Sequence, residues 1–337
     1  MKNSLLIATS AAILALAPVA FAPNANATPL DTKGIPAEAQ GIVHVDYDQF
    51  AKSPLSAALL QQADQKKYEA LKTQYGFDPA KDLNAVTIGF IKPAGESDTP
   101  AYFGVARGKF SPEKIIAAAK QANASVTTEG GRAIIDNLTL DIPNQPSQKT
   151  ALGIIDSSTL LFAPDKAGLA KAIAAYDGQA KSYAAPAALD KLRKQTATPL
   201  ILGYLGSDIT PEAREGGAMM PVSIPKADSI CFSLAEDGQG QSQNLRARVR
   251  SDFADPDDAQ QLQGTIQMLM GFAQMGIAKA GAATGPQADQ ARMVQKLLSS
   301  LQVNVDGNTL DIALAYPVAD LVKAIQTYSK RFSETAE

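Results

Sequence analysis

Short runs of alternating hydrophobic and polar residues occur in pairs along the chain, and the pairs are separated by segments with helical spacing. A period of two is typical of a strand with one buried face, whereas spacing of three or four is typical of an amphipathic helix. Several pairs are joined by Gly, Asn or Asp turns such as Asp306-Gly307-Asn308, which predicts antiparallel hairpins. We therefore expect an α+β fold with a mostly antiparallel sheet and helices packed on one face.

The same order of elements occurs twice. In each half, a strand leads to a phenylalanine and then to a capping residue, a proline and an acid that begin a helix, first at Phe110 and again at Phe253. The closing segments also match, because AGLAKAIAAY (167–176) and ADLVKAIQTY (319–328) are identical at six of ten positions. This recurrence predicts two copies of one structural unit.

These matches define the expected domains. We assign residues 36–185 to the first α+β repeat and residues 196–330 to the second. The first copy has an additional hairpin at residues 125–140 that the second lacks. The other parts are a signal peptide (1–27), an N-terminal segment (28–35), a connection between the repeats (186–195) and a C-terminal tail (331–337).

The repeat also predicts equivalent side chains. Arg107 and Arg250 each precede the matched phenylalanine by three residues. In the closing helices, a leucine and an isoleucine four residues apart share one face, which we expect to be buried, whereas a lysine two residues after each leucine should lie outside it. The expected core residues are Leu169, Ile173, Leu321 and Ile325, and the expected exposed residues are Lys171 and Lys323.

This organisation loosely resembles uncharacterised secreted bacterial proteins that are built from duplicated strand-pair and helix units. The resemblance rests on the paired strands, the proline-initiated helices and the matched closing segments, and it covers most of the chain after residue 27. It implies the α+β fold. It transfers no catalytic motif, so it implies no activity.

A group of four aspartates, Asp252, Asp255, Asp257 and Asp258, raises the question of a cation site. A calcium loop spreads its oxygen ligands over about 12 residues, with a glycine at the turn and a bidentate glutamate at the end. The segment has neither. Asp255 is instead placed to cap a helix whose first residue is Pro256, with the next two acids at the positive end of the helix dipole. We expect a helix start and no metal site.

The first residues have the organisation of a secretory signal peptide. Lys2 precedes an apolar stretch over residues 5–22, and Ala25-Asn26-Ala27 fits an A-x-A cleavage site. We expect cleavage after Ala27 and a periplasmic or secreted protein. No later stretch approaches the roughly 18 uninterrupted apolar residues of a membrane span, so no integral membrane segment is expected after cleavage.

Charge and residue usage make several classes of function unlikely. The chain has 31 basic and 34 acidic residues, a balance that does not suit nucleic acid, whose affinity for proteins depends on Lys and Arg. Its single cysteine, Cys231, cannot form an internal disulfide and is expected to be a buried, inert thiol. Its single histidine, His44, excludes metal sites that need two.

The best catalytic candidate is His44 with Asp46 and Asp48, which alternate along VHVDYD. Two carboxylates beside an imidazole could orient a general base, as in a hydrolase. In the alternative that we favour, the strand ends at Asp46, Asp48 caps or opens the next turn, and His44 is half-buried. The sequence contains no G-x-S-x-G, C-x-x-C or H-E-x-x-H motif, so we predict no enzyme class and no cofactor.

The helix that begins at Pro256 has two apolar stripes. One stripe should face the sheet; it consists of Leu262, Ile266, Leu269, Ala273 and Ile277. The other consists of Met268, Phe272 and Met275 and points well over 90° away, at about 100° per residue, so one sheet cannot cover both. Either the segment 288–300 folds back and covers the second stripe with Met293, Leu297 and Leu298, or the stripe binds another molecule.

We therefore expect a non-enzymatic periplasmic or secreted protein that binds an apolar ligand or a partner protein, with Met268, Phe272 and Met275 as the candidate contact residues. A purely structural component of the envelope is the alternative. An envelope hydrolase that uses His44 is the less favoured third possibility.

Overall fold

The computed structural model describes residues 29–62, 69, 72–73, 78–92, 101–140, 148–196, 198–210, 224–238, 243–280 and 286–334. The predicted signal peptide and its cleavage site lie outside these residues. The chain divides into two compact units, the first formed by Met1–Ala187 with Val322–Glu337 and the second by Ala188–Leu321.

The first unit contains an antiparallel sheet with the strand order β1-β2-β3-β7-β6-β5-β4. Its strands are β1 (Gly41–Asp46), β2 (Leu83–Ile91), β3 (Ala101–Gly108), β4 (Ser125–Glu129), β5 (Arg132–Leu140), β6 (Gln148–Asp156) and β7 (Thr159–Ala163). Its helices are α2 (Tyr47–Phe50), α3 (Pro54–Gln62), α5 (Pro79–Asp82), α6 (Pro112–Gln121) and α7 (Lys166–Tyr176).

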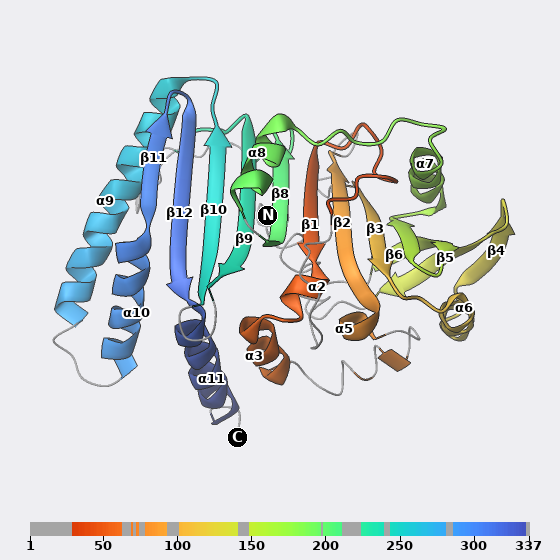
Figure 1. Ribbon diagram of the computed structural model, residues 1–337, viewed down its shortest axis with the longest axis horizontal. Coiled ribbons are helices and arrows are strands. Elements are labelled where there is room, and N and C mark those ends of the chain that lie inside the picture. The colour runs from red at the N-terminus through yellow and green to blue at the C-terminus, as the bar shows by residue number, and fades with distance from the viewer. Residues whose placement is uncertain are drawn as a thin grey trace. The chain divides into compact units, whose positions relative to one another are not determined.

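The second unit contains an antiparallel sheet with the order β8-β9-β10-β12-β11. Its strands are β8 (Pro199–Gly206), β9 (Ser229–Asp237), β10 (Asn244–Asp252), β11 (Gln302–Asp306) and β12 (Thr309–Pro317). The helices α8 (Ala187–Gln195), α9 (Pro256–Ala280) and α10 (Pro286–Ser300) belong to this part of the chain, and α11 (Val318–Glu334) follows β12. Figure 1 shows α9 and α10 side by side, next to β11 and β12.

The two sheets have the same strand order. The series β1-β2-β3-β7-β6 corresponds to β8-β9-β10-β12-β11, and the first unit adds the hairpin β4–β5 at its far edge. This hairpin turns through Gly130 and Gly131, whose φ angles of 55° and 79° favour glycine. The α+β class and the antiparallel pairing predicted from the sequence are confirmed.

A recurring backbone contact holds the helix start of each unit against the hairpin that follows it. The amide of Phe110 donates to the carbonyl of Ser157 at 2.7 Å, and the amide of Phe253 donates to the carbonyl of Asn308 at 2.9 Å. Both phenylalanines are buried. The phenylalanine between the strand and the helix is therefore fixed in both units by its backbone and by its side chain.

The closing helices differ in burial. In α7, Leu169 is fully buried and Lys171 is exposed, and the helix packs on β7, β6 and β3. In α11, Lys323 is exposed as expected, but Leu321 is only partly buried. The prediction of equal core positions was therefore wrong for three of the four residues, because Ile173, Leu321 and Ile325 are all partly buried.

The sheet residues give a physical reason for the difference. Leu169 lies over a face of the first sheet that includes Val105 and Leu161, both fully buried, and Gly153, where a Cβ atom would be 3.3 Å from Leu169. The corresponding positions of the second sheet are Arg248 and Asp311. They form an ion pair, with Arg248 Nε 2.8 Å from Asp311 Oδ1, so they offer no comparable apolar surface.

A hydrophobic cluster of the second unit lies on the other face of its sheet. Ala259, Phe253 and Leu310 are buried at its centre, and partly buried side chains surround them, namely Ile230, Leu262, Ile266, Val303, Val305 and Ile312. The side-chain Nε2 of Gln263 donates to the carbonyl of Val303 at 3.1 Å and connects α9 to β11. The first turns of α9 are therefore firmly packed.

The start of α9 is as predicted. The Asp255 carboxylate accepts a hydrogen bond from the amide of Asp257 at 2.9 Å, and Pro256 is the first helical residue. Within the described residues, no three His, Cys, Asp or Glu side chains are grouped so as to hold a metal ion. None of the described helices is both long and apolar enough to cross a membrane.

Asp255→Ala should lower the free energy of unfolding by about 1 kcal/mol, the usual loss for an N-cap. Thermal melting of both proteins in the presence and absence of millimolar calcium gives the measurement. Calcium should leave both melting temperatures unchanged. A calcium-dependent rise in the wild type that the variant lacks would show that the aspartates bind the ion.

Leu169→Ala should cost about 2 to 5 kcal/mol, because it empties a fully buried position. Leu321→Ala should cost less, since Leu321 is partly exposed. Lys171→Ala serves as the exposed control and should stay within about 0.5 kcal/mol of the wild type. Urea unfolding of the three variants tests this order, and equal costs for the two leucines would contradict it.

Candidate binding surface

Helix α9 changes its environment along its length. Its first turns contribute Ala259, Thr265 and the partly buried Leu262 to the core, but beyond Thr265 most residues on the outer side are exposed. Since α9 is 25 residues long, and thus about 37 Å, its second half continues well past the packed first turns.

Helix α10 folds back against α9, so the predicted helical hairpin is present. It contacts both α9 and β12, and Ala291 is buried. Met293, Leu297 and Leu298 are each partly buried. The hairpin therefore forms and buries part of its own apolar residues.

The hairpin does not cover the second stripe of α9. Met268 is 44% exposed, Phe272 59% and Met275 56%, and Leu269, which was expected to face the sheet, is 40% exposed. We call Met268, Leu269, Phe272 and Met275 the α9 surface. The expectation for Leu269 was wrong, because the sheet does not extend under this part of the helix well enough to bury it.

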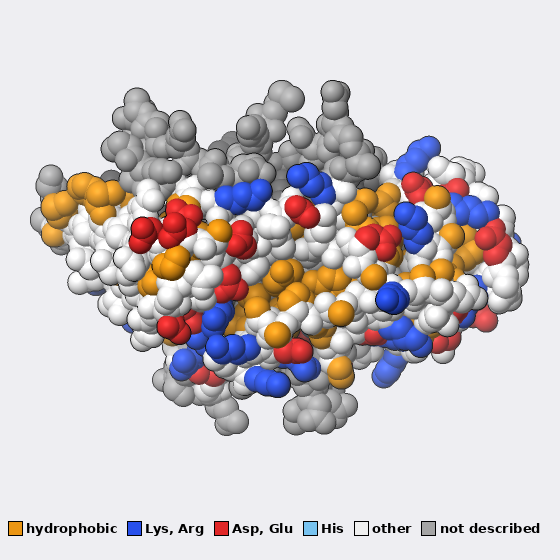
Figure 2. All heavy atoms as spheres, turned by 90° about the horizontal axis from the view of Figure 1, so that it is seen from above, with side chains coloured by type: hydrophobic (Ala, Val, Ile, Leu, Met, Phe, Trp, Pro, Cys, Tyr) orange, Lys and Arg blue, Asp and Glu red, His pale blue; other side chains and the backbone are white. Residues whose placement is uncertain are grey.

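The α9 surface is also uncharged. No charged residue occurs in the sequence between Asp258 and Lys279, and the polar residues of the exposed side are glutamines such as Gln267 and Gln274. On the adjoining helix, Val294 is 37% exposed as well. Figure 2 shows hydrophobic side chains gathered at the left end of the face, the end at which Figure 1 draws α9. Apolar patches of this kind on soluble proteins often mark interaction sites.

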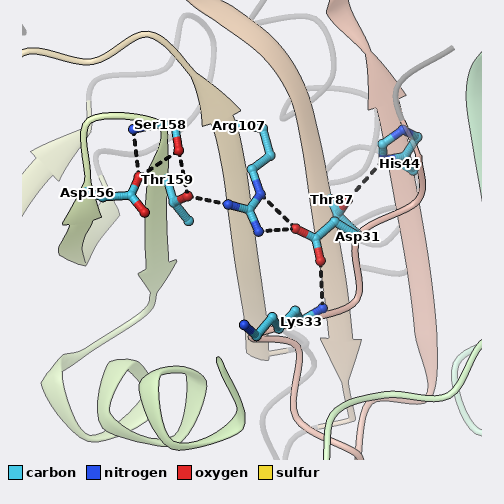
Figure 3. Close-up of polar contacts among 8 residues, drawn as sticks. All are labelled: Asp31, Lys33, His44, Thr87, Arg107, Asp156, Ser158 and Thr159. Carbon is cyan, nitrogen blue, oxygen red and sulfur yellow. Dashed lines mark hydrogen bonds and ion pairs between the residues drawn. The ribbon is translucent and has the colours of Figure 1, made fainter. Parts of the chain in front are cut away.

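The catalytic candidate His44 lies inside the first unit. His44 and Asp46 are both buried on β1, and Asp46 ends the strand. His44 Nδ1 is 2.9 Å from Thr87 Oγ1 on the paired strand β2 (Figure 3). Asp46 is the N-cap of α2, where its carboxylate accepts a hydrogen bond from the amide of Gln49 at 3.0 Å.

Asp48 lies in α2 and is held separately. Both of its carboxylate oxygens accept hydrogen bonds from Asn84 Nδ2, at 3.0 Å and 2.8 Å. The sequence had suggested Asp48 as a possible cap of this helix, but the capping residue is Asp46. His44 is more deeply buried than expected. Each of these three side chains has a contact that stabilises the local backbone or the strand pair.

A polar network around Arg107 fixes the N-terminal segment, as Figure 3 shows. The Arg107 guanidinium forms an ion pair with Asp31 at 2.5 Å and also donates to Thr159 at the start of β7. The Lys33 amide donates to Asp31 at 2.9 Å, and the Lys33 ammonium lies 4.4 Å from the centre of the Tyr176 ring. Arg107 therefore links β3, β7 and the segment that precedes β1.

The same network includes a hydrogen-bonded pair, Asp156 and Ser158, in the turn before Thr159. Ser158 Oγ donates to Asp156 Oδ1 at 2.7 Å, as does the Ser158 amide. Burial acts to raise the pKa of Asp156, but the hydrogen bonds from Ser158 outweigh it and hold that pKa below its ordinary value. The carboxylate stays ionised and shapes the turn between β6 and β7.

From the sequence, Arg107 was identified only as the equivalent of Arg250 in the repeat. Its counterpart Arg250 contacts the equivalent threonine, with Nη2 3.4 Å from Thr309 Oγ1. The Arg–Thr contact could have been predicted from the sequence, because the arginine recurs in both repeats and a threonine begins both β7 and β12. The participation of Asp31 had no such signal, because the N-terminal segment has no counterpart in the second repeat.

Comparison with protein-family models and with curated protein sequences finds no match to this chain. Among solved structures, crystal forms III and I of TP0453 are 11% identical to it, with TM-scores of 0.48 and 0.45. Each covers 89% of this chain, and the matched regions span 99% and 98% of the respective TP0453 chains. Crystal form IV gives a TM-score of 0.47 at 10% identity. These likenesses are distant and carry no functional inference.

Cys231 is fully buried on β9, and burial raises the pKa of its thiol to about 11. Because the thiolate is the reactive form, the native protein should react very slowly with a thiol reagent at pH 8 and rapidly once unfolded in guanidinium. The raised pKa also means that this thiol favours folding below pH 9, and that its contribution is lost between about pH 9 and pH 11. Rapid labelling of the native protein at pH 8 would contradict the burial.

Proposed function

We propose that this is a non-enzymatic periplasmic or secreted protein that binds a protein partner through the α9 surface. The observation that carries the proposal is the exposure of Met268, Phe272 and Met275 on a helix whose hairpin partner is already in place. Methionine side chains are flexible and polarisable and suit adaptable binding surfaces.

The geometry of the surface favours a protein over a small ligand. Small-molecule sites are concave and enclose most of the ligand, whereas the exposed side of a helix is convex. A convex apolar helix matches the groove or the apolar helix face of another protein. Phe272, the most exposed of the four side chains, is suited to be an anchor in such a contact.

The charge of the surface disfavours a membrane as the partner. Helices that lie on bilayers combine an apolar side with Lys and Arg on the polar side, which attract anionic lipids. The exposed side of α9 has glutamines in these positions, and its first turn contains Asp257 and Asp258. A negatively charged helix start beside an uncharged apolar patch is better suited to a protein surface.

The contacts of His44, Asp46 and Asp48 support binding over hydrolysis as the function to test first. Each side chain stabilises a strand pair or a helix start, and His44 is buried. We therefore base the proposal on α9 and assign no catalytic residue.

Replacing Met268, Phe272 and Met275 together by Ser should remove the bound partner without unfolding the protein, because these side chains are half exposed or nearly so. Purification from the native envelope at low detergent, followed by mass spectrometry of the associated proteins, gives the measurement. The matched control replaces the exposed Gln260, Gln267 and Gln274 of the same helix by Ser and should retain the partner.

Three outcomes would overturn this proposal. If wild type and triple variant retain the same proteins, the partner binds elsewhere. If the wild type retains only lipid, and the triple variant loses it, the surface serves an apolar ligand. A triple variant that fails to be secreted or unfolds at several kcal/mol lower stability would show that the stripe is part of the core.

A further inference from the structure

Three glycines in α9 have no explanation within the chain itself. Gly264, Gly271 and Gly276 lie in the interior of the helix, where glycine is markedly less favourable than alanine. A Cβ atom at any of the three would meet nothing within 4 Å outside the helix's own backbone. No packing contact of the described chain therefore requires them.

Two of the glycines alternate with the exposed methionines. Gly264, Met268, Gly271 and Met275 follow one another at intervals of four, three and four residues. At about 100° per residue they lie within about 60° of arc, in a single line along the helix. This is the spacing of the a and d positions of a heptad, which form the seam between paired helices.

We propose that the partner of the α9 surface is a second copy of this chain, with the two α9 helices packed antiparallel. This inference rests on the function proposed above and names the partner. In an antiparallel pair centred between Met268 and Gly271, Met268 faces Gly271 of the second copy, and Met275 faces Gly264 of the second copy. By two-fold symmetry, each glycine receives a methionine in return.

The pattern fits this arrangement because each protruding side chain meets a position without one. Small residues allow helix backbones to approach closely, and knobs fill holes in the facing helix. A parallel pair in register would instead place Met268 against Met268 and Gly271 against Gly271. The methionine pairs would then be crowded, and the glycine pairs would leave voids. An isologous contact needs a self-complementary surface, and this sequence is self-complementary only in the antiparallel sense.

The charges agree with the same direction. The first turn of α9 contains Asp257 and Asp258, and Lys279 is the next charged residue in the sequence. Antiparallel packing sets the acidic start of each helix beside the end of the other, where Lys279 stands, whereas parallel packing would bring four acids together. Between these ends the seam contains no charge that would have to be desolvated.

The test fills the holes without disturbing the fold. Gly264→Gln combined with Gly271→Gln places helix-favouring side chains in open space, so the monomer should be at least as stable as the wild type. Sedimentation velocity across a concentration series should show a wild-type dimer, and the double variant should raise its dissociation constant by about tenfold or more. Gly276→Gln is the matched control; it lies about 120° from Gly264 and should leave the dimer intact.

A disulfide cross-link tests the direction. An oxidised equimolar mixture of Gly264→Cys and Met275→Cys proteins should give a mixed dimer if the helices are antiparallel. In a parallel pair these positions are separated by 11 residues, about 16 Å along the axis, beyond the reach of a disulfide. A dimer that forms no such bridge would overturn the register.

The remaining outcomes separate this inference from the proposed function. A wild type that is monomeric at tens of micromolar overturns the second copy as partner. If a different protein is then retained by the wild type and lost by the serine variant, binding at α9 stands with another partner. If the double glutamine variant remains dimeric, the dimer uses another surface, and the inference is wrong.

Discussion

The pairing of strands that are distant in sequence is the constraint on which each unit depends. Within each sheet, neighbouring strands are consecutive in the chain except at one place, where β3 pairs with β7 and β10 pairs with β12. These pairs close long stretches of chain, as the separations of 52 residues between Arg107 and Thr159 and 59 between Arg250 and Thr309 show. The closure costs entropy that many local contacts must offset. The Arg–Thr contacts and the amides of Phe110 and Phe253 lie at this junction in both units.

What is inserted between the paired strands distinguishes the two units. In the first, the chain between β3 and β7 forms α6 and the β4–β5 hairpin, which extends the sheet. In the second, it forms α9 and α10, which pack on β11 and β12. A hairpin that joins a sheet satisfies its backbone and buries one face. A long helical hairpin has more surface than the sheet can cover, and the exposed α9 surface is the result.

Much of the fold could be predicted from the sequence because its signals are local. Alternation, the Gly and Asn turns, and the cap with Pro at 255–256 identified the strands, the hairpins and the start of α9 without tertiary information. The burial of α11 could not be predicted in this way. Its helix resembles α7 in sequence, but the sheet residues that would receive it are Arg248 and Asp311 where the first unit has Val105 and Leu161. Sequence likeness of a helix says nothing about the surface below it.

The candidate surface was predictable in part for the same reason. Helical periodicity showed that Met268, Phe272 and Met275 point away from the sheet, but whether the following helix would cover them depended on how the hairpin packs. Leu269 was predicted to face the sheet because we took the sheet to cover the whole length of α9, but Leu269 is exposed. The glycines between the methionines were visible in the sequence, yet their meaning depends on the open space around them.

If the chain is exported and cleaved as the sequence predicts, the packing of the N-terminal segment would constrain when that segment can fold. If cleavage follows Ala27, only three residues separate the new amino terminus from Asp31, which is tied to Arg107. Three residues span at most about 11 Å, so the segment cannot reach its place beside Tyr176 while a membrane-embedded leader holds its start far from the folded unit. Lys33, Ile35 and Arg107 would then complete their contacts only after cleavage, and processing would be the step that releases the last part of the first unit to fold.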